Sequence, residues 1–356
     1  MTSSASTPTP AEAAPTSRYR SPFLDRRGAV EGEGVDQGVA WHYGDPTREQ
    51  RGLEAGLAFV DLSHRGVVRV GGPDRLSWLH SLTTQKLTDL APRTSTEALV
   101  LSPKGHIEHD LHLVDDGEAT WATVEPGTAG ALVEWLRRMQ FLLRVEVDDV
   151  TADWAVLGEP VRRESQDGEP LAWVDGWPAT SPGGARYCPL DDDEHPGADR
   201  PWREVIVPRT DLARHVGDWE LAGTWAAEAL RVAAWRPRLG FETDHRTIPH
   251  EIDLLRTAVH LEKGCYRGQE TVARVRNLGR PPRRLVMLHL DGSGHQLPAR
   301  GAQVLLGDRA IGHLTTSARH HELGPIALAL VKRSAPVDAE LVVDGVAAAQ
   351  EPIVQV

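Results

Sequence analysis

The sequence predicts an α+β fold that ends in a small antiparallel β-barrel. The first 158 residues mix short hairpins with helices and lack the steady strand–helix alternation of a doubly wound sheet. From Arg284 onward, short apolar runs are punctuated by glycine and proline, which is typical of a small barrel. The chain of 356 residues also exceeds one ordinary core, so we expect two or three domains.

The N-terminal half carries clear start signals for three helices. Asp45-Pro46-Thr47 predicts a helix start with a capping carboxylate and a first-turn proline, and Gly56 predicts its end. Gly72-Pro73-Asp74 predicts a second helix, and residues 128–140 form a third with an apolar stripe. Strands are predicted over residues 67–70, 97–101, 107–114, 119–124, 143–147 and 154–157, with 97–101 and 107–114 joined as a hairpin.

The middle of the chain is acidic, and the pattern there is irregular. Residues 159–200 hold ten acidic and four basic residues, so we expect a variable acidic loop over 159–203. A strand at 204–207 and helices at 211–216 and 221–234 follow. The barrel strands are predicted at 285–290, 303–306, 311–315, 326–331 and 340–343.

These patterns divide the chain into five regions. The tail is rich in Ser, Thr, Ala and Pro and lacks the features of a secretory signal, so we expect it to be disordered. The predicted regions are this tail (1–20), an N-terminal α+β region (21–158), the acidic loop (159–203), a second α+β region (204–283) and the barrel (284–356).

Composition and charge exclude several function classes. No apolar run approaches the length of a membrane span, and two cysteines cannot form a disulfide framework, so we expect a cytoplasmic protein. The formal charge of −12 argues against a general nucleic-acid binder. Residues 256–284 nevertheless hold eight basic and two acidic residues, which indicates either a solvated surface or a site for an anionic ligand or partner.

The most informative segment is Lys263-Gly264-Cys265-Tyr266-Arg267-Gly268-Gln269-Glu270. It places a thiol near two glycines, with a lysine two residues before it and an arginine two residues after. Nearby cations stabilise the thiolate, which is the reactive form of cysteine. Cys188 stands beside the acidic run 191–194, so we expect it to be the less reactive thiol. The alternative role for Cys265 is that of a small buried hydrophobe.

A second candidate site is the strand over residues 106–113. Alternation places His106, Glu108, Asp110 and His112 on one face, and Ile107, His109, Leu111 and Leu113 on the other. The polar face could be solvated or could line a cavity that binds a cationic or amidine-like group, and alternation alone favours the solvated face.

A metal site made by the protein alone is not expected. The loop over residues 236–251 is rich in charge and proline, as functional loops often are. However, His245, His250, His260 and Cys265 are separated by five, ten and five residues, which fits no compact ligand pattern.

The cysteine segment resembles the signature of the YgfZ family of folate-binding proteins, which is related to the aminomethyltransferase (T-protein) of the glycine cleavage system. The extension Thr271-Val272-Ala273-Arg274 fits as well, and the resemblance runs from about Trp41 to the C-terminus. Asp61-Leu62-Ser63, Gly72-Pro73-Asp74 and residues 79–85 are similar to the N-terminal region of T-proteins.

The resemblance implies a three-lobed ring around a central channel that holds tetrahydrofolate or a derivative. Regions 21–158 and 204–283 would both bind folate, and Cys265 would be the key residue, with Lys263 and Asp110 as catalytic neighbours. The residues implied to contact folate are Glu108, Asp110, Arg231, Glu251, Tyr266, Arg267, Gly268, Gln269 and Glu270. Members of the family act in assembly or repair of iron–sulfur clusters in selected enzymes, including tRNA-methylthiolating enzymes, so Fe–S enzymes or assembly proteins are the expected partners.

Two departures from the T-protein pattern concern the folate site. Where T-proteins carry Gly-Gly-Ile-x-Asp-Asp-Leu, this chain has residues 105–111, and the first paired aspartate is His109. Where they carry Leu-Arg-x-Glu, this chain has Leu230-Arg231-Val232-Ala233, so alanine replaces the pterin-binding carboxylate. An alanine side chain accepts no hydrogen bonds, so it cannot bind the N–H groups of a pterin. The carboxylate of Asp110, Glu108 or Glu251 could take that role instead.

Three functions follow as hypotheses. The first is a folate-binding accessory protein for Fe–S enzymes with a reactive Cys265. The second is an aminomethyltransferase of the glycine cleavage type, which His109 and Ala233 oppose. The third is a non-enzymatic scaffold for a client protein or tRNA, supported only by the basic stretch 256–284.

Overall fold

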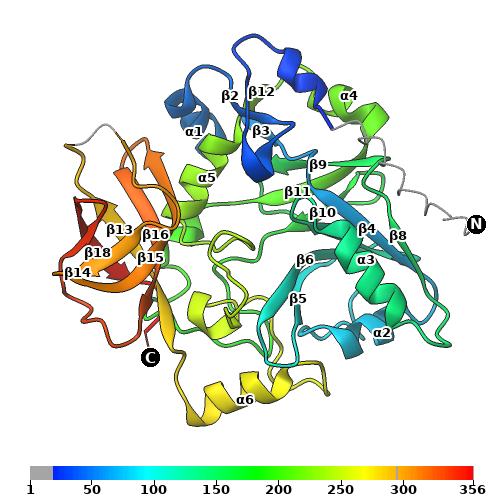
Figure 1. Cartoon of the computed structure of the whole chain (residues 1–356). Coiled ribbons are helices and arrows are strands. Elements are labelled where there is room, and N and C mark those ends of the chain that lie inside the picture. The colour runs from blue at the N-terminus through cyan, green and yellow to red at the C-terminus, as the bar shows by residue number, and fades with distance from the viewer. Residues whose placement is uncertain (1–18, 294–295, 356) are drawn as a thin grey trace, which may run out of the picture.

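Two five-stranded sheets and a closed barrel form three lobes in the computed structural model, which describes residues 19–293 and 296–355 (Figure 1). The predicted tail, residues 1–20, lies almost entirely outside the described residues. Among the described residues, no helix is long and apolar enough to cross a membrane.

The first sheet is antiparallel throughout and is contiguous in sequence. Its strand order is β5 (Ser95–Leu101), β6 (Ile107–Asp115), β7 (Ala119–Val124), β4 (Gly66–Gly71) and β8 (Glu146–Asp149). Helices α2 (Arg75–Leu82) and α3 (Ala129–Arg138) bury their apolar residues against one face, where Leu79 and Leu132 join the strand residues Val68 and Leu111 in one core. On the opposite face, Leu99 and Leu101 of β5 join a different apolar core, and Glu97, Asp110 and His112 are polar.

The second sheet takes strands from distant parts of the chain. Its order is β10 (Leu171–Val174), β11 (Arg203–Pro208), β9 (Trp154–Glu159), β3 (Ala58–Asp61) and β12 (Glu220–Ala222), and only the β12–β3 pair is parallel. Helices α1 (Pro46–Glu54) and α5 (Thr224–Ala233) pack on it, and α4 (Leu212–Val216) lies at its outer side. A two-stranded ribbon, β1 (Val30–Glu31) with β2 (Ala40–His42), completes this lobe.

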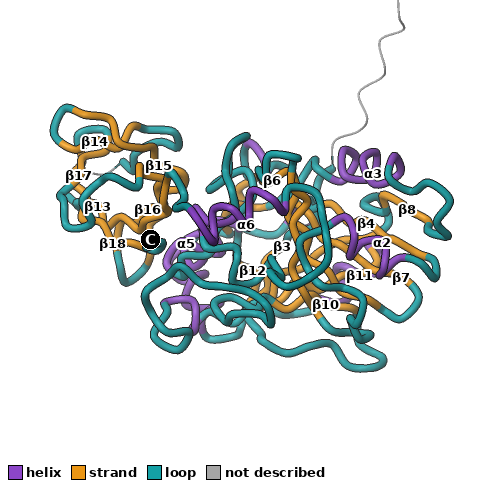
Figure 2. The backbone as a smooth tube through the Cα atoms, turned by 90° about the horizontal axis from the view of Figure 1, so that it is seen from below, coloured by secondary structure: helices purple, strands orange, loops and turns teal. Residues whose placement is uncertain are grey.

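The C-terminal lobe is a closed antiparallel barrel, as the sequence predicts. Its order is β13 (Arg283–Leu290), β16 (Gly324–Lys332), β15 (Arg309–His320), β14 (Gln303–Leu306), β17 (Leu341–Val343) and β18 (Val346–Pro352), and β18 returns to pair with β13. Seen from below, the barrel stands beside the rest of the molecule, with α5 and α6 (Gln269–Leu278) at the junction (Figure 2). The predicted fold class is therefore confirmed.

Several elements differ from the prediction. Helix α6 was not expected, because its apolar residues are few and stand among charged ones; Val272 is its one buried side chain. Strand β10 lies inside the stretch predicted to be irregular, where it pairs with β11. The strand expected at 143–147 begins at Glu146, because the apolar run before it forms an exposed loop in which Leu142 is 100% exposed. Residues 220–222 form a strand where a helix start was predicted at 221, and strands β1, β2, β3 and β18 were not predicted.

Candidate functional site

The motif loop, residues 263–268, lies against the C-terminal end of α2. The Lys263 side chain anchors it, because Nζ donates hydrogen bonds to the carbonyls of His80, Thr83 and Gln85. Carbonyls at a helix C-terminus lack partners inside the helix, and a lysine is well suited to satisfy them. Lys263 is only 7% exposed, and burial lowers its pKa to about 8. The structure gives Lys263 an anchoring role, and its catalytic role stays a prediction.

Cys265 is exposed between two buried neighbours, Lys263 and Tyr266. Lys263 Nζ lies 5.0 Å from the centroid of the Tyr266 ring, so the two side chains pack together under the loop. Arg267 pairs with Glu108 at 2.9 Å and lies over the ring of Trp135 in α3. Both cations of the motif are thus held by other groups, and the loop presents the thiol to solvent.

Gly268 turns the motif loop into α6. Its φ is +84°, and a Cβ at this position would lie 2.6 Å from the carbonyl oxygen of Ser102 in the β5–β6 turn. A side chain is excluded on both counts. Gln269 opens α6 and donates a long hydrogen bond of 3.5 Å to the Lys263 carbonyl, while Glu270 is exposed. Lys263 and Gly268 therefore fix the conformation of the loop, and Cys265 is exposed at its surface.

A narrow polar cavity, here called the central cavity, lies between the two sheets and the segment that follows α5. Its free volume is about 40 Å³, room for a few water molecules at most. The strands β6, β7, β10 and β11 contribute to its wall. The lining residues used below are Arg65, Asp110, His112, Glu204, Arg231 and Arg236.

Ion pairs crowd around the central cavity. Five arginines and seven carboxylates form these pairs: Arg65, Arg200, Arg231, Arg236 and Arg238 with Asp36, Glu97, Glu125, Asp175, Glu204, Glu228 and Glu242. Buried charges persist only when they are paired and hydrogen-bonded, so this network fixes the position of every member.

Asp110 lies among these groups and has no ion pair within the part of the chain that the structure describes. Its Oδ1 and the Oε2 of Glu97 are both buried without a hydrogen-bond partner. Burial, together with the neighbouring Glu97, raises the pKa of Asp110 to about 8. His112, on the same strand face, donates through Nδ1–H to the Glu204 carboxylate at 3.0 Å. The cavity-lining interpretation of this face holds for Asp110 and His112, whereas Glu108 is exposed.

The other predicted folate contacts are dispersed. Arg231 is 5% exposed and pairs with Glu228 and Glu242, both at 2.9 Å. Glu251 is fully buried and accepts from Arg283 at 2.7 Å. The predicted set therefore divides between the central cavity (Asp110 and Arg231), the motif loop with its partner Glu108, and the base of α6.

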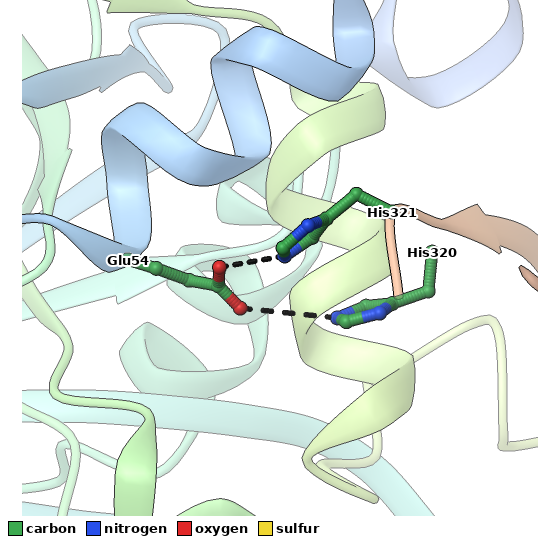
Figure 3. A group of neighbouring side chains, drawn as sticks. All are labelled: Glu54, His320 and His321. Carbon is green, nitrogen blue, oxygen red and sulfur yellow. Dashed lines mark ion pairs between the residues drawn. The ribbon is translucent and has the colours of Figure 1, made fainter. Parts of the chain in front are cut away.

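A second, larger pocket lies beside Ala233 and is here called the side pocket. It has a free volume of about 290 Å³ and shares Arg200 and Trp202 with the wall of the central cavity. Apolar walls come from Leu53, Leu230, Leu323 and three prolines, and Glu54 and His320 add polar groups at the rim. Figure 3 shows Glu54 of α1 facing His320 and His321 at the end of β15.

Glu97, Arg236 and Glu54 were missed by reasoning from the sequence. The β5–β6 register pairs Glu97 with His112, so the predicted hairpin contained the signal for Glu97. Arg236 lies in an irregular segment, and Glu54 meets the barrel only through the tertiary fold, so no local pattern marks either of them.

Comparison with known proteins places this geometry in a family. Residues 22–158 match the GCVT N-terminal domain, and residues 283–351 match the glycine cleavage T-protein C-terminal barrel domain. An aminomethyltransferase of Moorella thermoacetica is 30% identical over 301 residues, which cover 78% of this chain and 78% of that protein. The chain belongs to the aminomethyltransferase, or T-protein, family.

Other similar proteins extend the comparison. A putative chloroplastic transferase of Arabidopsis thaliana is 25% identical over 334 residues, covering 88% of this chain and 74% of that protein. The crystal structure of the glycine cleavage system aminomethyltransferase T from Bartonella henselae superposes with a TM-score of 0.75. It covers 94% of this chain and 95% of that chain at 18% identity, which shows the shared fold.

The two pockets differ in how they fit the folate that the T-protein family implies. The central cavity is far below the few hundred Å³ of an ordinary ligand site. The side pocket approaches that size, has mostly apolar walls with Trp202 among them, and places the half-exposed carboxylate of Glu54 beside Ala233. The residues present therefore fit a pterin in the side pocket, where Glu54 would supply the acceptors that alanine lacks.

Proposed function

We propose that this protein is a tetrahydrofolate-binding accessory protein of the YgfZ type, which supports assembly or repair of clusters in Fe–S enzymes. The observation that carries the proposal is the construction of the motif loop. Lys263 and Tyr266 are buried beneath it, Gly268 locks it to the β5–β6 turn, and Cys265 stands exposed at its surface. A thiol held out on a fixed loop is suited to contact a second macromolecule or a cluster.

Folate binding is the second part of the proposal. The side pocket would hold the pterin, with Glu54 accepting from its N–H edge and Trp202 forming part of the apolar wall. Bound folate would supply one-carbon or redox chemistry. The side chains of this chain would orient the ring and exclude water from it.

An aminomethyltransferase of the glycine cleavage type is the alternative, because relatives such as the M. thermoacetica protein carry that name. His109 and Ala233 oppose it. Ala233 brings no carboxylate to the side pocket. His109 brings an imidazole whose pKa burial lowers, in place of an aspartate. Formation of methylene-tetrahydrofolate from an aminomethylated lipoyl carrier would favour this alternative.

The scaffold hypothesis loses most of its support. Of the basic residues in 256–284, Arg256, Lys263 and Arg284 are buried, and Arg267 and Arg283 are paired with carboxylates. The remaining basic residues there lie on part of α6 and at its C-terminal end, so the charge count of this stretch gives the scaffold hypothesis little support.

Two measurements test the proposal. Calorimetric titration with tetrahydrofolate should show binding to the wild type and to Cys265→Ala, and at least tenfold weaker binding to Glu54→Gln, since each good hydrogen bond to a charged group contributes about 1.5–3 kcal/mol. In cells that lack the chromosomal copy of the gene, a plasmid-borne Cys265→Ala variant should fail to restore Fe–S enzyme activity. The control variant Cys188→Ala should restore it to the wild-type level. Full activity with Cys265→Ala would overturn the role of the thiol, and undiminished binding to Glu54→Gln would overturn the site.

A further inference from the structure

Three side chains in the central cavity are arranged like ligands of a metal ion. Glu97 of β5 and Asp110 and His112 of β6 each offer one ligand atom, and these atoms all lie within 4.8 Å of one another. The sheet itself produces this arrangement. The β5–β6 register sets Glu97 directly opposite His112, and Asp110 stands two residues away on the same face.

Two of these oxygen atoms have no hydrogen-bond partner among the described residues. Asp110 Oδ1 and Glu97 Oε2 are buried without a hydrogen-bond partner among the described residues, and their residues are 8% and 4% exposed. Arg236 pairs with Glu97 through Oε1 at 2.8 Å, which leaves Oε2 free to face Asp110. Unsatisfied carboxylate oxygens in a buried site are costly, so a proton or a cation must stand between them.

His112 is oriented as metal-binding histidines are. Its Nδ1 lies 3.0 Å from Oε2 of Glu204, and Arg65 and Thr123 hold that carboxylate in turn. The ring stacks on Trp173 with centroids 3.7 Å apart and planes 6° apart. A carboxylate on one ring nitrogen fixes the tautomer and directs the other nitrogen, here Nε2, at a metal.

The cavity is small, and its arginines are held by carboxylates. Its lining contains five arginines and the carboxyl groups of Asp110, Glu125, Asp175 and Glu204, and each of these arginines is held in an ion pair. A free volume of about 40 Å³ accommodates an ion with a few waters and excludes an organic cofactor.

The comparable group at the side pocket lacks this support. Glu54, His320 and His321 also offer ligand atoms within 4.8 Å (Figure 3). However, Nδ1 of His320 accepts hydrogen bonds from the backbone N–H groups of Glu322 and Leu323, both at 3.2 Å. The proton of a neutral His320 must then sit on Nε2, the atom that faces Glu54, so this imidazole cannot ligate a metal without losing those bonds.

We propose that Glu97, Asp110 and His112 bind a divalent first-row transition metal ion in the central cavity. One imidazole and two carboxylates suit Mn²⁺, Fe²⁺ or Zn²⁺, and waters would complete the coordination. The proposal is independent of folate binding and of Cys265, since it involves neither the side pocket nor the motif loop.

The test uses the full-length protein after treatment with a chelator. Titration with Co²⁺, followed by its visible absorption, and with Zn²⁺, followed by calorimetry, should give one site per chain. Asp110→Asn should weaken binding at least tenfold, while the matched control Glu54→Gln leaves it unchanged. Circular dichroism establishes that each variant is folded, and His112→Asn provides a second ligand variant.

Three results would overturn the site. Wild-type protein that binds neither ion would mean that a shared proton occupies the gap between Asp110 and Glu97. Equal affinity in Asp110→Asn, or loss of affinity in Glu54→Gln, would place the ion elsewhere. Intense thiolate-to-cobalt absorption would assign the binding to a cysteine.

Discussion

The two thiols of this chain lie in opposite surroundings. Cys265 is exposed on the motif loop, whereas Cys188 is 4% exposed and packs in the core between α5, α6 and the barrel. Burial raises the pKa of Cys188, which lowers its thiolate fraction at neutral pH. We therefore expect the difference in reactivity between the two thiols to come from their exposure. Lys263 contributes less, because its ammonium group is hydrogen-bonded to carbonyls at the C-terminal end of α2.

We predict that iodoacetamide alkylates Cys265 well before Cys188 in the native protein at neutral pH. Peptide mass spectrometry after short exposures measures both rates in one sample. In denaturant the two rates should converge, because the unfolded chain removes the difference in access. Faster native labelling of Cys188 would show that the core around it opens readily.

The two glycines of the motif differ in how well their positions tolerate a side chain. Gly268 has φ +84° and no room for a Cβ, whereas the nearest atom to a Cβ at Gly264 would be His80 Nε2 at 4.0 Å. We predict that Gly268→Ala lowers the free energy of unfolding by about 1–3 kcal/mol and that Gly264→Ala changes it by less than about 0.5 kcal/mol. Urea unfolding of both variants checks this; equal losses would contradict the assignment.

Residue patterns in the sequence identified part of the candidate site. Alternation along 106–113 correctly grouped Asp110 with His112, since one strand face is a local property. Whether that face met solvent or a cavity depended on the second sheet and on the arginines after α5, which are distant in sequence. For the same reason the ion pair of Glu251 with Arg283 could not be anticipated.

Among the elements, α6 depends on tertiary support more than on its own sequence. It has a single buried side chain, Val272, and the carbonyl of that residue lies 3.2 Å from Nε2 of the buried His250. Its apolar residues Val272, Val275 and Leu278 recur every three residues, but Leu278 is 87% exposed, so the periodic signal is weak. Strand β10 escaped prediction for a related reason, because its four residues stand within a Pro- and Gly-rich acidic stretch.

The surroundings of His250 predict acid sensitivity in this region. Burial lowers its pKa to about 4, below the value near 6.5 of an unfolded histidine. A lowered folded pKa contributes stability that is complete above pH 6.5 and is lost as the pH falls toward 4, because the unfolded chain then binds the extra proton.

We predict that His250→Gln shows a smaller fall in the free energy of unfolding than the wild type between about pH 7 and about pH 4.5. Chemical denaturation at several pH values measures the fall. The exposed His245 provides the control, and His245→Gln should follow the wild-type curve. Parallel curves for wild type and His250→Gln would mean that other groups cause the acid loss.

For the whole molecule, Glu242 is a principal link between the lobes. Its carboxylate is fully buried and takes hydrogen bonds from Arg231 in α5 and from Thr315 and Thr316 in the barrel strand β15. Around this contact, the side chains of α5 pack against the core that includes the barrel residues Leu285 and Leu328. The barrel is thus joined to the rest by a buried polar link within an apolar core.

We predict that Glu242→Gln lowers the free energy of unfolding by about 3 kcal/mol, since it removes one partner of a buried ion pair. Asp211→Asn is the matched control, because its pair with Arg214 is solvent-exposed and contributes about 0–1 kcal/mol. Denaturant unfolding compares the two. Similar small losses in both variants would show that the apolar core alone joins the lobes.

At this scale the sequence was most informative about the barrel. Most of its strands are apolar runs bounded by turn residues, so five of the six carry their own signal, and β18 is the exception. The second sheet was the least predictable part. Its parallel pair joins β3 to β12 across the whole first sheet and the acidic stretch 159–203, and nothing local marks either strand as the partner of the other.

That parallel pair has a consequence for synthesis on the ribosome. The first sheet is complete once residue 149 has emerged, but β3 must wait for β12, which ends at residue 222. During that interval the nascent chain carries an unpaired strand edge, which is a template for aggregation. The edge of β3 that pairs with β12 therefore stays uncovered while the acidic stretch 159–203 is translated.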